Sequence, residues 1–421
     1  MRRIADVAGD IYGTVGFQAP EIADAGPSVS SDLYTLGRTL AVLTLDLPGY
    51  QNELRHALPD PAGHPALERF DSFHRFLLKA TAPHPDDRFQ SADEMADQLW
   101  GVMREVVALS TGIPRPAPPV AFGPTTDDYD VAPLAVDPTD PAATFLSNLS
   151  GDDPADVLGR ISAATATGQV EETVGVRLRR ARALLDRGDH GDHENAEFEL
   201  ESIQRSDPWE WRAVWLQGAG ALAAGRLPAA ASAFDRCWSE VPGELAPKLA
   251  AALVAERSGE VARAAALHAL VATVDPTYVA AARGLARCRA QMGDVDGALA
   301  AYELIPRTHT AFAGAQLDGV STLIEAGSFA AAADRLARLE VDHLRRAELE
   351  ARLFSVALAA VLAGRLDPRP GTLLGDHPLD ERGLRSGLEA ALLRQASRTA
   401  DRATRFRLVD LASSVRPVTL R

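Results

Sequence analysis

The chain has 421 residues, enough for two or three domains that each bury a core. Hydrophobic residues make up 46% of it but aromatic residues only 6%, and a sequence rich in alanine, leucine and arginine favours helices. The formal net charge of −15 argues against a nucleic acid or an anionic membrane as the main partner. The two cysteines, Cys237 and Cys288, form no C-x-x-C pair, which excludes a disulfide framework and a cysteine-based zinc site.

No segment of the sequence has the length and apolarity of a membrane span. The longest apolar run, Leu353 to Ala363, is interrupted by Ser355 and is too short to cross a bilayer. The first residues, Met1 to Asp6, lack the apolar core of a signal peptide. We therefore expect a cytoplasmic, all-α protein that binds no metal ion.

The first informative stretch, Ile11 to Ile22, contains the motif G-T-V-G-F-Q-A-P-E. It resembles the end of a eukaryotic-type protein-kinase activation segment, where a substrate-binding P+1 loop precedes Ala-Pro-Glu. The pattern G-T-x-x-[FY]-x-A-P-E belongs to serine/threonine kinases rather than tyrosine kinases. The predicted loop residues are Gly13, Thr14, Gly16 and Phe17, and the predicted structural residues that follow are Ala19, Pro20 and Glu21.

Three helices are predicted in the rest of residues 1–110. Leucines at three- and four-residue spacing after a Ser/Asp start predict a largely buried helix over 33–43. A second helix is predicted over 70–80. A third is predicted over 91–107, where Ser91 and Glu94 match a capping box.

These helices carry further kinase-like features. Asp32 and Gly37 fit the D-x-[WY]-x-x-G opening of kinase helix F, and Arg88 fits the arginine near the end of a kinase C-lobe. The resemblance implies a buried ion pair between Arg88 and Glu21, and backbone hydrogen bonds from a catalytic loop to Asp32. Such buried carboxylates need a guanidinium or N–H donors to offset desolvation. We predict a partial kinase C-lobe, helices F to I, over 1–110; the alternative is an unrelated helical domain with Glu21 and Arg88 solvated.

The ATP-binding half of a kinase is not found in this sequence. Only ten residues precede Ile11, and they hold no glycine-rich loop, V-A-I-K lysine, H-R-D or D-F-G motif. We therefore predict no catalytic residue and no ATP or Mg²⁺ site in this chain, and no phosphate transfer by it alone.

Residues 111–150 are predicted to be a linker. Nine prolines occur among the 41 residues from Pro114 to Pro154, and proline fixes φ and removes a backbone donor. We expect this segment to run extended over a surface and to mark a domain boundary.

Residues 151–421 contain a repeat with a period of 34 residues, and this period and content resemble the tetratricopeptide repeat. The repeat predicts stacked helix pairs. In each unit glycine lies at the turn between two helices, alanine where the helices approach closely, a large residue in the groove and proline at the end. The columns are Gly225, Gly259, Gly293 and Gly327; Ala230, Ala264, Ala298 and Ala332; Phe234, His268, Tyr302 and Leu336; and Pro208, Pro242 and Pro276.

The 34-residue spacing of the glycines changes at both ends of the repeat array. Gly188 and Gly364 are each 37 residues from the nearest glycine of the column, which predicts irregular flanking repeats, with 384–415 as a final helix pair.

Three groups of residues in this part of the chain have the residue types of functional sites, but we expect each of them to be structural. The loop 190–193, H-G-D-H, is expected to bind no metal, and both cysteines are expected to be inert core thiols. The tryptophans of 209–215 are expected to pack within the repeats, with an exposed partner surface as the alternative.

The order of lobe, linker and repeats resembles one family closely, the actinobacterial serine/threonine protein kinase G family. Specific runs spread along nearly the whole chain carry this resemblance. They are residues 12–22, 34–41, 43–48, 104–107, 136–140, 242–250 and 408–417.

The family resemblance implies an ATP- and Mg²⁺-dependent kinase with an amino-terminal rubredoxin-like module that holds iron through C-x-x-C pairs. It implies a forkhead-associated-domain substrate that regulates 2-oxoglutarate and glutamate metabolism. It also implies repeats that pack on the kinase lobe and can mediate a homodimer. This chain contains neither the C-x-x-C pairs nor the ATP site.

Our leading hypothesis is a kinase of this type represented from its P+1 loop onward, with protein partners bound through the tetratricopeptide groove. The alternative is a non-catalytic scaffold that retains a kinase remnant, and residual catalysis by the chain is a third idea. An upstream open frame that encodes D-F-G, H-R-D and C-x-x-C would exclude the scaffold.

Overall fold

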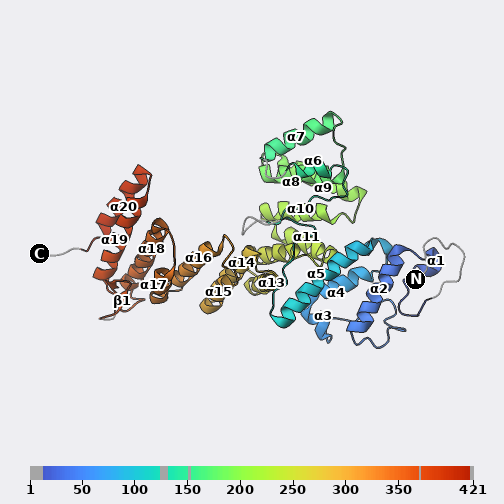
Figure 1. Cartoon of the computed structure of the whole chain (residues 1–421), viewed down its shortest axis with the longest axis horizontal. Helices are drawn as coiled ribbons and strands as arrows, with labels where there is room; N and C mark the ends of the chain where they lie inside the picture. Colours follow the sequence, from blue (N-terminus) through green and yellow to red (C-terminus); the bar gives the residue numbers. More distant parts are fainter. Residues whose placement is uncertain (1–12, 124–130, 150–152, 369–370, 418–421) are drawn as a thin grey trace. The chain divides into compact units, whose positions relative to one another are not determined.

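The computed structural model describes residues 13–123, 131–149, 153–368 and 371–417, so Ile11 and Tyr12 of the loop motif lie outside it. The regular secondary structure of the described chain is almost wholly helical, which confirms the all-α prediction (Figure 1). It divides into two compact units, residues 1–280 and 281–421. The division falls inside the repeats, whereas the sequence suggested a boundary at the linker.

The first unit begins with a helical region over residues 13–111, which we call the N-terminal region. Its elements are α1 (Ile22–Ala25), α2 (Val29–Thr44), α3 (Pro65–Arg69), α4 (Asp71–Ala80), the 3₁₀ turn Pro85–Asp87 and α5 (Ala92–Thr111). Its core contains Phe73, Phe76, Leu77 and Phe89 from α4 and the turn after it. All three helices predicted from the sequence are present.

The helix starts differ from the prediction in one detail. The Ser91 side chain accepts a hydrogen bond from the Glu94 backbone, as a capping box requires, but the Glu94 carboxylate accepts from Gln90 and Lys79 instead of reaching back to Ser91. The complete capping box is at α2, between Ser28 and Ser31.

The rest of the first unit is a stack of antiparallel helix pairs. These helices are α6 (Ala143–Ser147), α7 (Pro154–Ala166), α8 (Val174–Arg187), α9 (Asp192–Ser206), α10 (Trp211–Ala223), α11 (Leu227–Glu240), α12 (Ala246–Arg257) and α13 (Val261–Val274). Gly225 and Gly259 end the first helix of their pairs with φ of 72° and 79°, a left-handed conformation that glycine adopts without strain.

The predicted linker packs against these repeats. Phe122 is buried and lies edge-on to Trp215, with ring centroids 4.7 Å apart. The Trp215 indole donates to the Ala132 carbonyl at 3.0 Å. Trp211 and Trp215 are therefore part of the repeat core, as predicted, whereas Trp209 is exposed.

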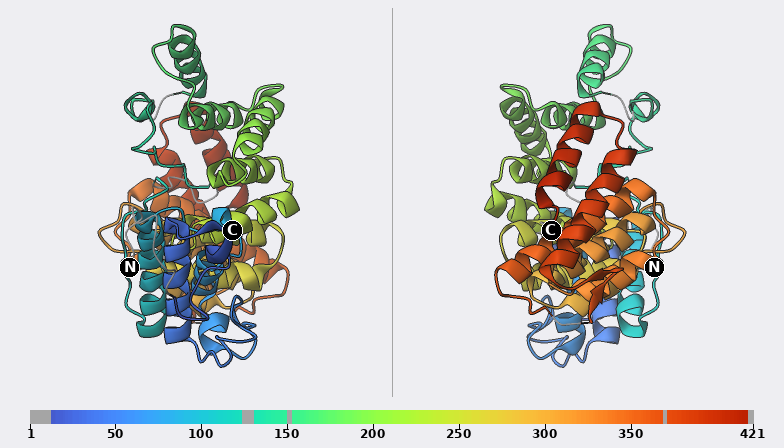
Figure 2. Two further views of the ribbon diagram at one scale, coloured as in Figure 1. Left: turned by 90° about the vertical axis from the view of Figure 1, so that its right-hand side faces the viewer. Right: turned by 90° about the vertical axis from the view of Figure 1, so that its left-hand side faces the viewer.

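The second unit continues the same helix-pair pattern. Its elements are α14 (Val279–Gln291), α15 (Val295–Tyr302), α16 (Phe312–Glu325), α17 (Phe329–Arg338), α18 (His343–Leu362), the short hairpin β1 (Leu373–Leu374) and β2 (His377–Pro378), α19 (Glu381–Arg398) and α20 (Arg402–Val415). The helices α18, α19 and α20 run side by side (Figures 1 and 2). No described helix is long and apolar enough to cross a membrane.

The predicted repeat columns occupy equivalent places in the two units. Gly293 and Gly327 have φ of 81° and 73°, like the two glycines of the first unit. The side chains of the alanine column and of the large-residue column are all buried.

Candidate functional site

The predicted P+1 loop forms a tight turn at the edge of the N-terminal region. The Phe17 amide donates to the Thr14 carbonyl at 3.1 Å, which closes the turn. Gly16 is buried with φ of 90°, and a Cβ there would lie 2.4 Å from the Tyr50 carbonyl, so this position requires glycine. Phe17 packs edge-on against Tyr50, while Thr14 points to solvent.

Arg38 on α2 supports this turn from inside the N-terminal region. Its side chain is fully buried, and its Nε donates to the Gly16 carbonyl at 3.0 Å. Its other two nitrogens each donate at 2.7 Å, to the carbonyls of Ala57 and Leu54. Burial lowers the pKa of Arg38 from its ordinary value. One guanidinium thus joins the loop, α2 and the segment after it.

The ion pair between Glu21 and Arg88 is present, as the kinase resemblance implied. Arg88 is buried, and its two terminal nitrogens donate to the two Glu21 oxygens at 2.7 and 2.8 Å. Its Nε donates to the Ala82 carbonyl at 2.7 Å, and the guanidinium lies over the Tyr34 ring. Burial alone would raise the pKa of Glu21, but the hydrogen bonds and charge of Arg88 outweigh it and lower that pKa.

The segment between these two anchors is therefore held at both ends. Arg38 binds the backbone at Gly16, and Arg88 binds the side chain of Glu21. Ala19 is buried between them and Pro20 is exposed. These two contacts restrict the conformations open to residues 16–21.

One face of α2 is open to solvent. Val29, Leu36 and Leu43 recur every seven residues, and Leu43 is 77% exposed. Asp32 lies on the same side of the helix and accepts no side-chain hydrogen bond from any residue that the structure describes. Gly37 lies on the opposite, buried side, where a Cβ would come within 2.7 Å of the Ala80 Cβ. The close packing of α2 on α4 therefore requires this glycine.

The N-terminal region is joined to the repeats through a buried polar cluster that we call the Lys248 interface. Lys248 on α12 and Glu105 on α5 are both buried, and their charged atoms lie 2.7 Å apart. Ser72 on α4 donates to the same Glu105 oxygen at 2.8 Å, and the Trp238 indole donates to Ser72 at 3.1 Å. Lys248 also donates to the Pro242 carbonyl at 2.8 Å. Every charged group here has several partners, as burial demands.

Backbone contact brings the two parts together at one point of this interface. The Gly243 amide donates to the Gln98 side chain at 2.8 Å. A Cβ on Gly101 would lie 2.2 Å from the Gly243 carbonyl, so α5 touches the repeat backbone directly.

Two further cations of α4 extend the interface at its rim. Arg75 donates to Asp235 at 2.7 Å and lies over the Trp238 ring. Lys79 lies 3.0 Å from Glu240. These partners belong to α11, so both α4 and α5 contact the repeats.

Sequence reasoning missed the roles of Arg38, Glu105, Gly243 and Lys248. All four lie in runs that carried the resemblance to the family, 34–41, 104–107 and 242–250. A buried arginine or lysine inside an otherwise apolar helix pattern is the signal that could have identified two of them.

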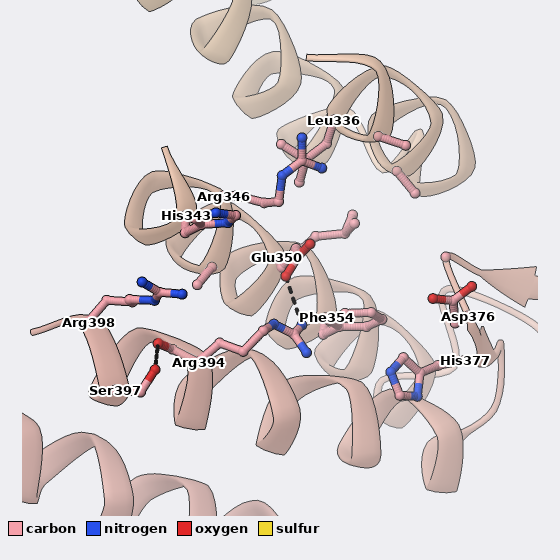
Figure 3. Close-up of a pocket in the computed structure, with 15 residues that line it drawn as sticks. Leu336, His343, Arg346, Glu350, Phe354, Asp376, His377, Arg394, Ser397 and Arg398 are labelled. Atoms are coloured by element: carbon pink, nitrogen blue, oxygen red, sulfur yellow. Dashed lines mark hydrogen bonds and ion pairs between the residues drawn. The ribbon is translucent and has the colours of Figure 1, made fainter. Parts of the chain in front are cut away.

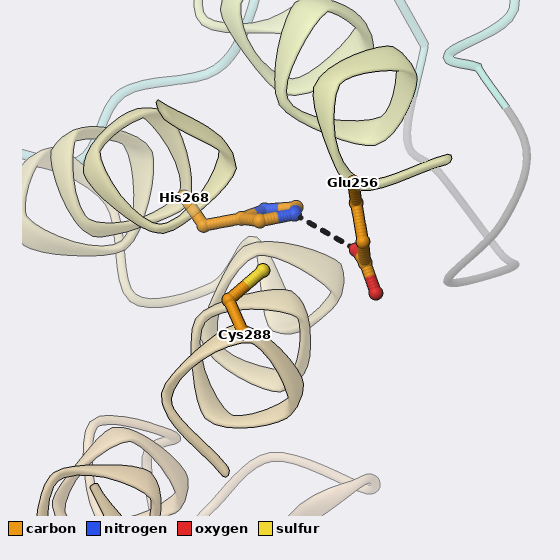
Figure 4. Close-up of side chains that lie close together, drawn as sticks. All are labelled: Glu256, His268 and Cys288. Carbon is orange, nitrogen blue, oxygen red and sulfur yellow. Dashed lines mark hydrogen bonds and ion pairs between the residues drawn. The ribbon is translucent and has the colours of Figure 1, made fainter. Parts of the chain in front are cut away.

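The repeat residues serve packing more than chemistry. Within the first unit, His268 Nε2 lies 3.2 Å from Glu256 Oε2, so the polar member of the large-residue column has a partner (Figure 4). In the loop 190–193, Asp192 binds the Arg187 guanidinium through both oxygens, which gives it a structural role. Cys237 and Cys288 are buried, as expected, and burial raises the pKa of the Cys237 thiol.

This chain matches a known protein family and known proteins. Residues 131–419 match the family described as Protein kinase G tetratricopeptide repeat. The chain is 35% identical over 454 residues to the serine/threonine-protein kinase PknG of Mycolicibacterium smegmatis, an alignment that covers 97% of this chain. It is also 35% identical over 457 residues to the serine/threonine-protein kinase PknG of Mycobacterium leprae. The chain spans 58% of the length of each of these relatives.

Proposed function

Since this chain belongs to the protein kinase G tetratricopeptide repeat family, we propose that it supplies the substrate-side lobe and the interaction domain of a serine/threonine protein kinase. The relatives' names support the kinase class. In this proposal residues 13–111 are the lower part of the kinase C-lobe, and the helix pairs up to α20 are the interaction domain.

The loop from Gly13 to Glu21 carries the proposal. Arg38 binds the backbone at Gly16 and Arg88 binds the end of the loop at Glu21, while Thr14 is exposed just before the first of these two contacts. A fixed loop beside an exposed threonine hydroxyl suits a surface that receives the residue after a phosphoacceptor, because orientation of the substrate is a large part of catalysis.

The open face of α2 supports a further part of the proposal. Its exposed leucines, and Asp32 with no side-chain partner in the described part of the chain, are suited to the catalytic half of a kinase domain. That half would cover the leucines and donate backbone hydrogen bonds to Asp32. ATP and Mg²⁺ would bind in that half and not in these 421 residues.

The proposed substrate of the complete enzyme is a forkhead-associated-domain regulator of 2-oxoglutarate and glutamate metabolism, with the tetratricopeptide groove as the protein-binding surface. The Lys248 interface would hold the repeats of the first unit against the N-terminal region. A substrate held by the repeats would then be presented to the lobe at high local concentration.

Phosphate transfer tests the proposal in two steps. Incubated with labelled ATP, Mg²⁺ and a forkhead-associated-domain protein, this chain alone is expected to yield no phosphoprotein. Joined to the part of the Mycolicibacterium smegmatis relative that it does not match, it is expected to phosphorylate that protein. In the joined enzyme Thr14→Ala should lower kcat/KM about 100-fold or more, since the kinase resemblance implies that this threonine hydrogen-bonds the catalytic aspartate and lysine of the other half.

The scaffold remains the second candidate because the N-terminal region is packed into the repeats as one compact unit. A joined protein that is folded and binds the forkhead-associated-domain protein, yet transfers no phosphate, would favour the scaffold and refute the kinase proposal. Transfer by the unjoined chain would contradict both.

A further inference from the structure

The second unit contains a cavity of about 490 Å³ between α17, α18 and α19, closed at one end by the turn of the β1–β2 hairpin. Its volume lies within the range of small-ligand pockets. Figure 3 shows its charged side chains, which come mainly from the first turns of α18 and the last turns of α19.

Positive charge gathers at one end of this cavity. Arg346 comes from α18, where His343 also lines the cavity, and Arg394 and Arg398 come from α19 (Figure 3). The antiparallel packing of α18 and α19 brings the two sets together. This is notable in a chain whose formal net charge is −15.

Two of these arginines have N–H groups for which no described residue supplies an acceptor. Arg394 is paired with Glu350 at 2.7 Å. Arg346 makes only a backbone hydrogen bond, to the Leu339 carbonyl, and Arg398 has no hydrogen-bond or ion-pair partner among the residues that the structure describes. Each guanidinium carries five N–H donors, so most of those on Arg346 and Arg398 are unused.

The carboxylates of the cavity do not cancel this charge. Glu350 is already neutralised by Arg394. Asp376 lies on the hairpin turn, beyond Phe354 and away from Arg398 (Figure 3). Within the described residues, the end of the cavity between Arg346 and Arg398 thus keeps two positive charges that no carboxylate pairs with.

Part of the remaining wall is apolar. Leu336, Leu353 and Phe354 are buried and line the cavity beside the arginines. The Ser397 side chain, next to Arg398, donates to the Arg394 carbonyl at 2.7 Å and leaves its oxygen lone pairs exposed. A ligand that fills the cavity would therefore have an anionic head and a small apolar body.

We propose that this cavity binds a phosphomonoester, with Arg346 and Arg398 as the ligands of its phosphate and Leu336, Leu353 and Phe354 as the contacts of its organic part. A phosphomonoester carries close to two negative charges at neutral pH, which match the two free guanidinium charges. The three phosphate oxygens can accept hydrogen bonds from the paired N–H groups of both arginines. A single carboxylate has only two oxygens and would leave some of these N–H groups without an acceptor. The phosphate could belong to a free metabolite or to a phosphorylated side chain of a protein.

Calorimetry on the whole chain at low salt tests this site. O-Phosphothreonine is expected to bind, whereas threonine gives no heat. Arg346→Gln and Arg398→Gln should each weaken binding about tenfold or more, because each removes a charge-assisted pair of hydrogen bonds. Arg398→Lys should retain part of the affinity, since it keeps the charge but loses the fork.

Arg382→Gln is the matched control. Arg382 lies on the same helix, is exposed and does not line the cavity, so its loss changes the net charge equally. It should leave the affinity for O-phosphothreonine unchanged within about twofold. Equal weakening by Arg382→Gln, or no binding by the parent chain at millimolar ligand, would overturn the proposal. Circular dichroism and Tm establish that each variant is folded.

Two further ligands identify the source of the phosphate. A phosphothreonine peptide that binds more tightly than O-phosphothreonine, while its unphosphorylated form does not bind, would assign the site to a phosphoprotein. Equal or tighter binding of O-phosphothreonine would assign it to a small phosphomonoester.

Discussion

At the scale of single residues, two buried arginines organise the candidate substrate loop. Arg88 neutralises a carboxylate, whereas Arg38 binds three carbonyl oxygens and no carboxylate. The pair with Glu21 could be predicted because it belongs to a known motif. The bonds of Arg38 could not, because they depend on where the backbone of residues 49–57 turns.

Loss of the Glu21 carboxylate is expected to destabilise the N-terminal region. Glu21→Gln leaves the buried Arg88 guanidinium without its counter-charge, which should lower the free energy of unfolding by about 3 kcal/mol. Urea denaturation at neutral pH measures this, with exposed Asp24→Asn as a control that should change stability by less than about 0.5 kcal/mol.

The ion pair between Glu21 and Arg88 should also make the free energy of unfolding depend on pH, in a direction that follows from the pKa of Glu21. Folding lowers the pKa of Glu21, so its contribution is complete above the ordinary glutamate pKa of 4.5 and is lost as the pH falls through the folded value. The stability difference between the parent chain and Glu21→Gln should therefore shrink in acid. A difference that stays constant from pH 7 to pH 3 would contradict this assignment.

At the scale of elements, helix periodicity and the 34-residue glycine period predicted most of the fold. The periodicity located α2, α4 and α5, and the final helix pair expected over 384–415 is present as α19 and α20. The left-handed glycines mark the turns where the 34-residue period placed them. The β1–β2 hairpin was not predicted, because a strand pair of two residues each leaves no alternating pattern. The family resemblance implied that the repeats pack on the kinase lobe, but the residues of the Lys248 interface were not predicted, because contacts between helices distant in sequence have no local signature.

The contact of α5 with the repeats makes a glycine-to-alanine exchange unfavourable. Alanine normally stabilises a helix relative to glycine by about 1 kcal/mol. In Gly101→Ala the new methyl group would meet the Gly243 carbonyl, so we expect a loss of about 1–3 kcal/mol by urea denaturation. Gly159→Ala in α7, where the methyl group meets nothing, should instead gain stability; a gain from both exchanges would refute the close contact.

The buried pair of this interface should behave as a unit. Lys248→Met leaves Glu105 charged and buried, which should cost about 3–5 kcal/mol. Adding Glu105→Gln removes that charge while Ser72 keeps an acceptor, so the double variant should recover part of the loss. Additive losses in a double-mutant cycle would mean that the two groups do not interact.

At the scale of the whole molecule, packing and sequence divide the chain differently. Proline content and motif order suggested lobe, linker and repeats, whereas contacts join the N-terminal region to the repeats up to residue 280. Composition indicates where a chain lacks regular secondary structure, whereas burial shows which parts of it share a core. The linker has little regular structure but still contributes Phe122 to the repeat core.

The shared unit predicts coupled hydrogen exchange. Because Lys248 and Glu105 belong to one interface, Lys248→Met in α12 should reduce amide protection in α5 as well as in α12. Mass spectrometry of exchanging peptides measures this. Arg352→Gln, which breaks the exposed pair with Glu325 in the second unit, should leave protection of α5 unchanged.

The buried ammonium of Lys248 has a practical consequence for dissecting the chain. If the repeats are expressed without residues 13–111, Lys248 loses Glu105, and the Trp238 ring loses its cover from α4. The excised array would then present a newly exposed tryptophan and an unpaired charge side by side, a surface prone to self-association. An excised array that begins in the proline-rich segment therefore calls for polar replacement at Trp238, whereas a cut beyond Val274 removes both Trp238 and Lys248.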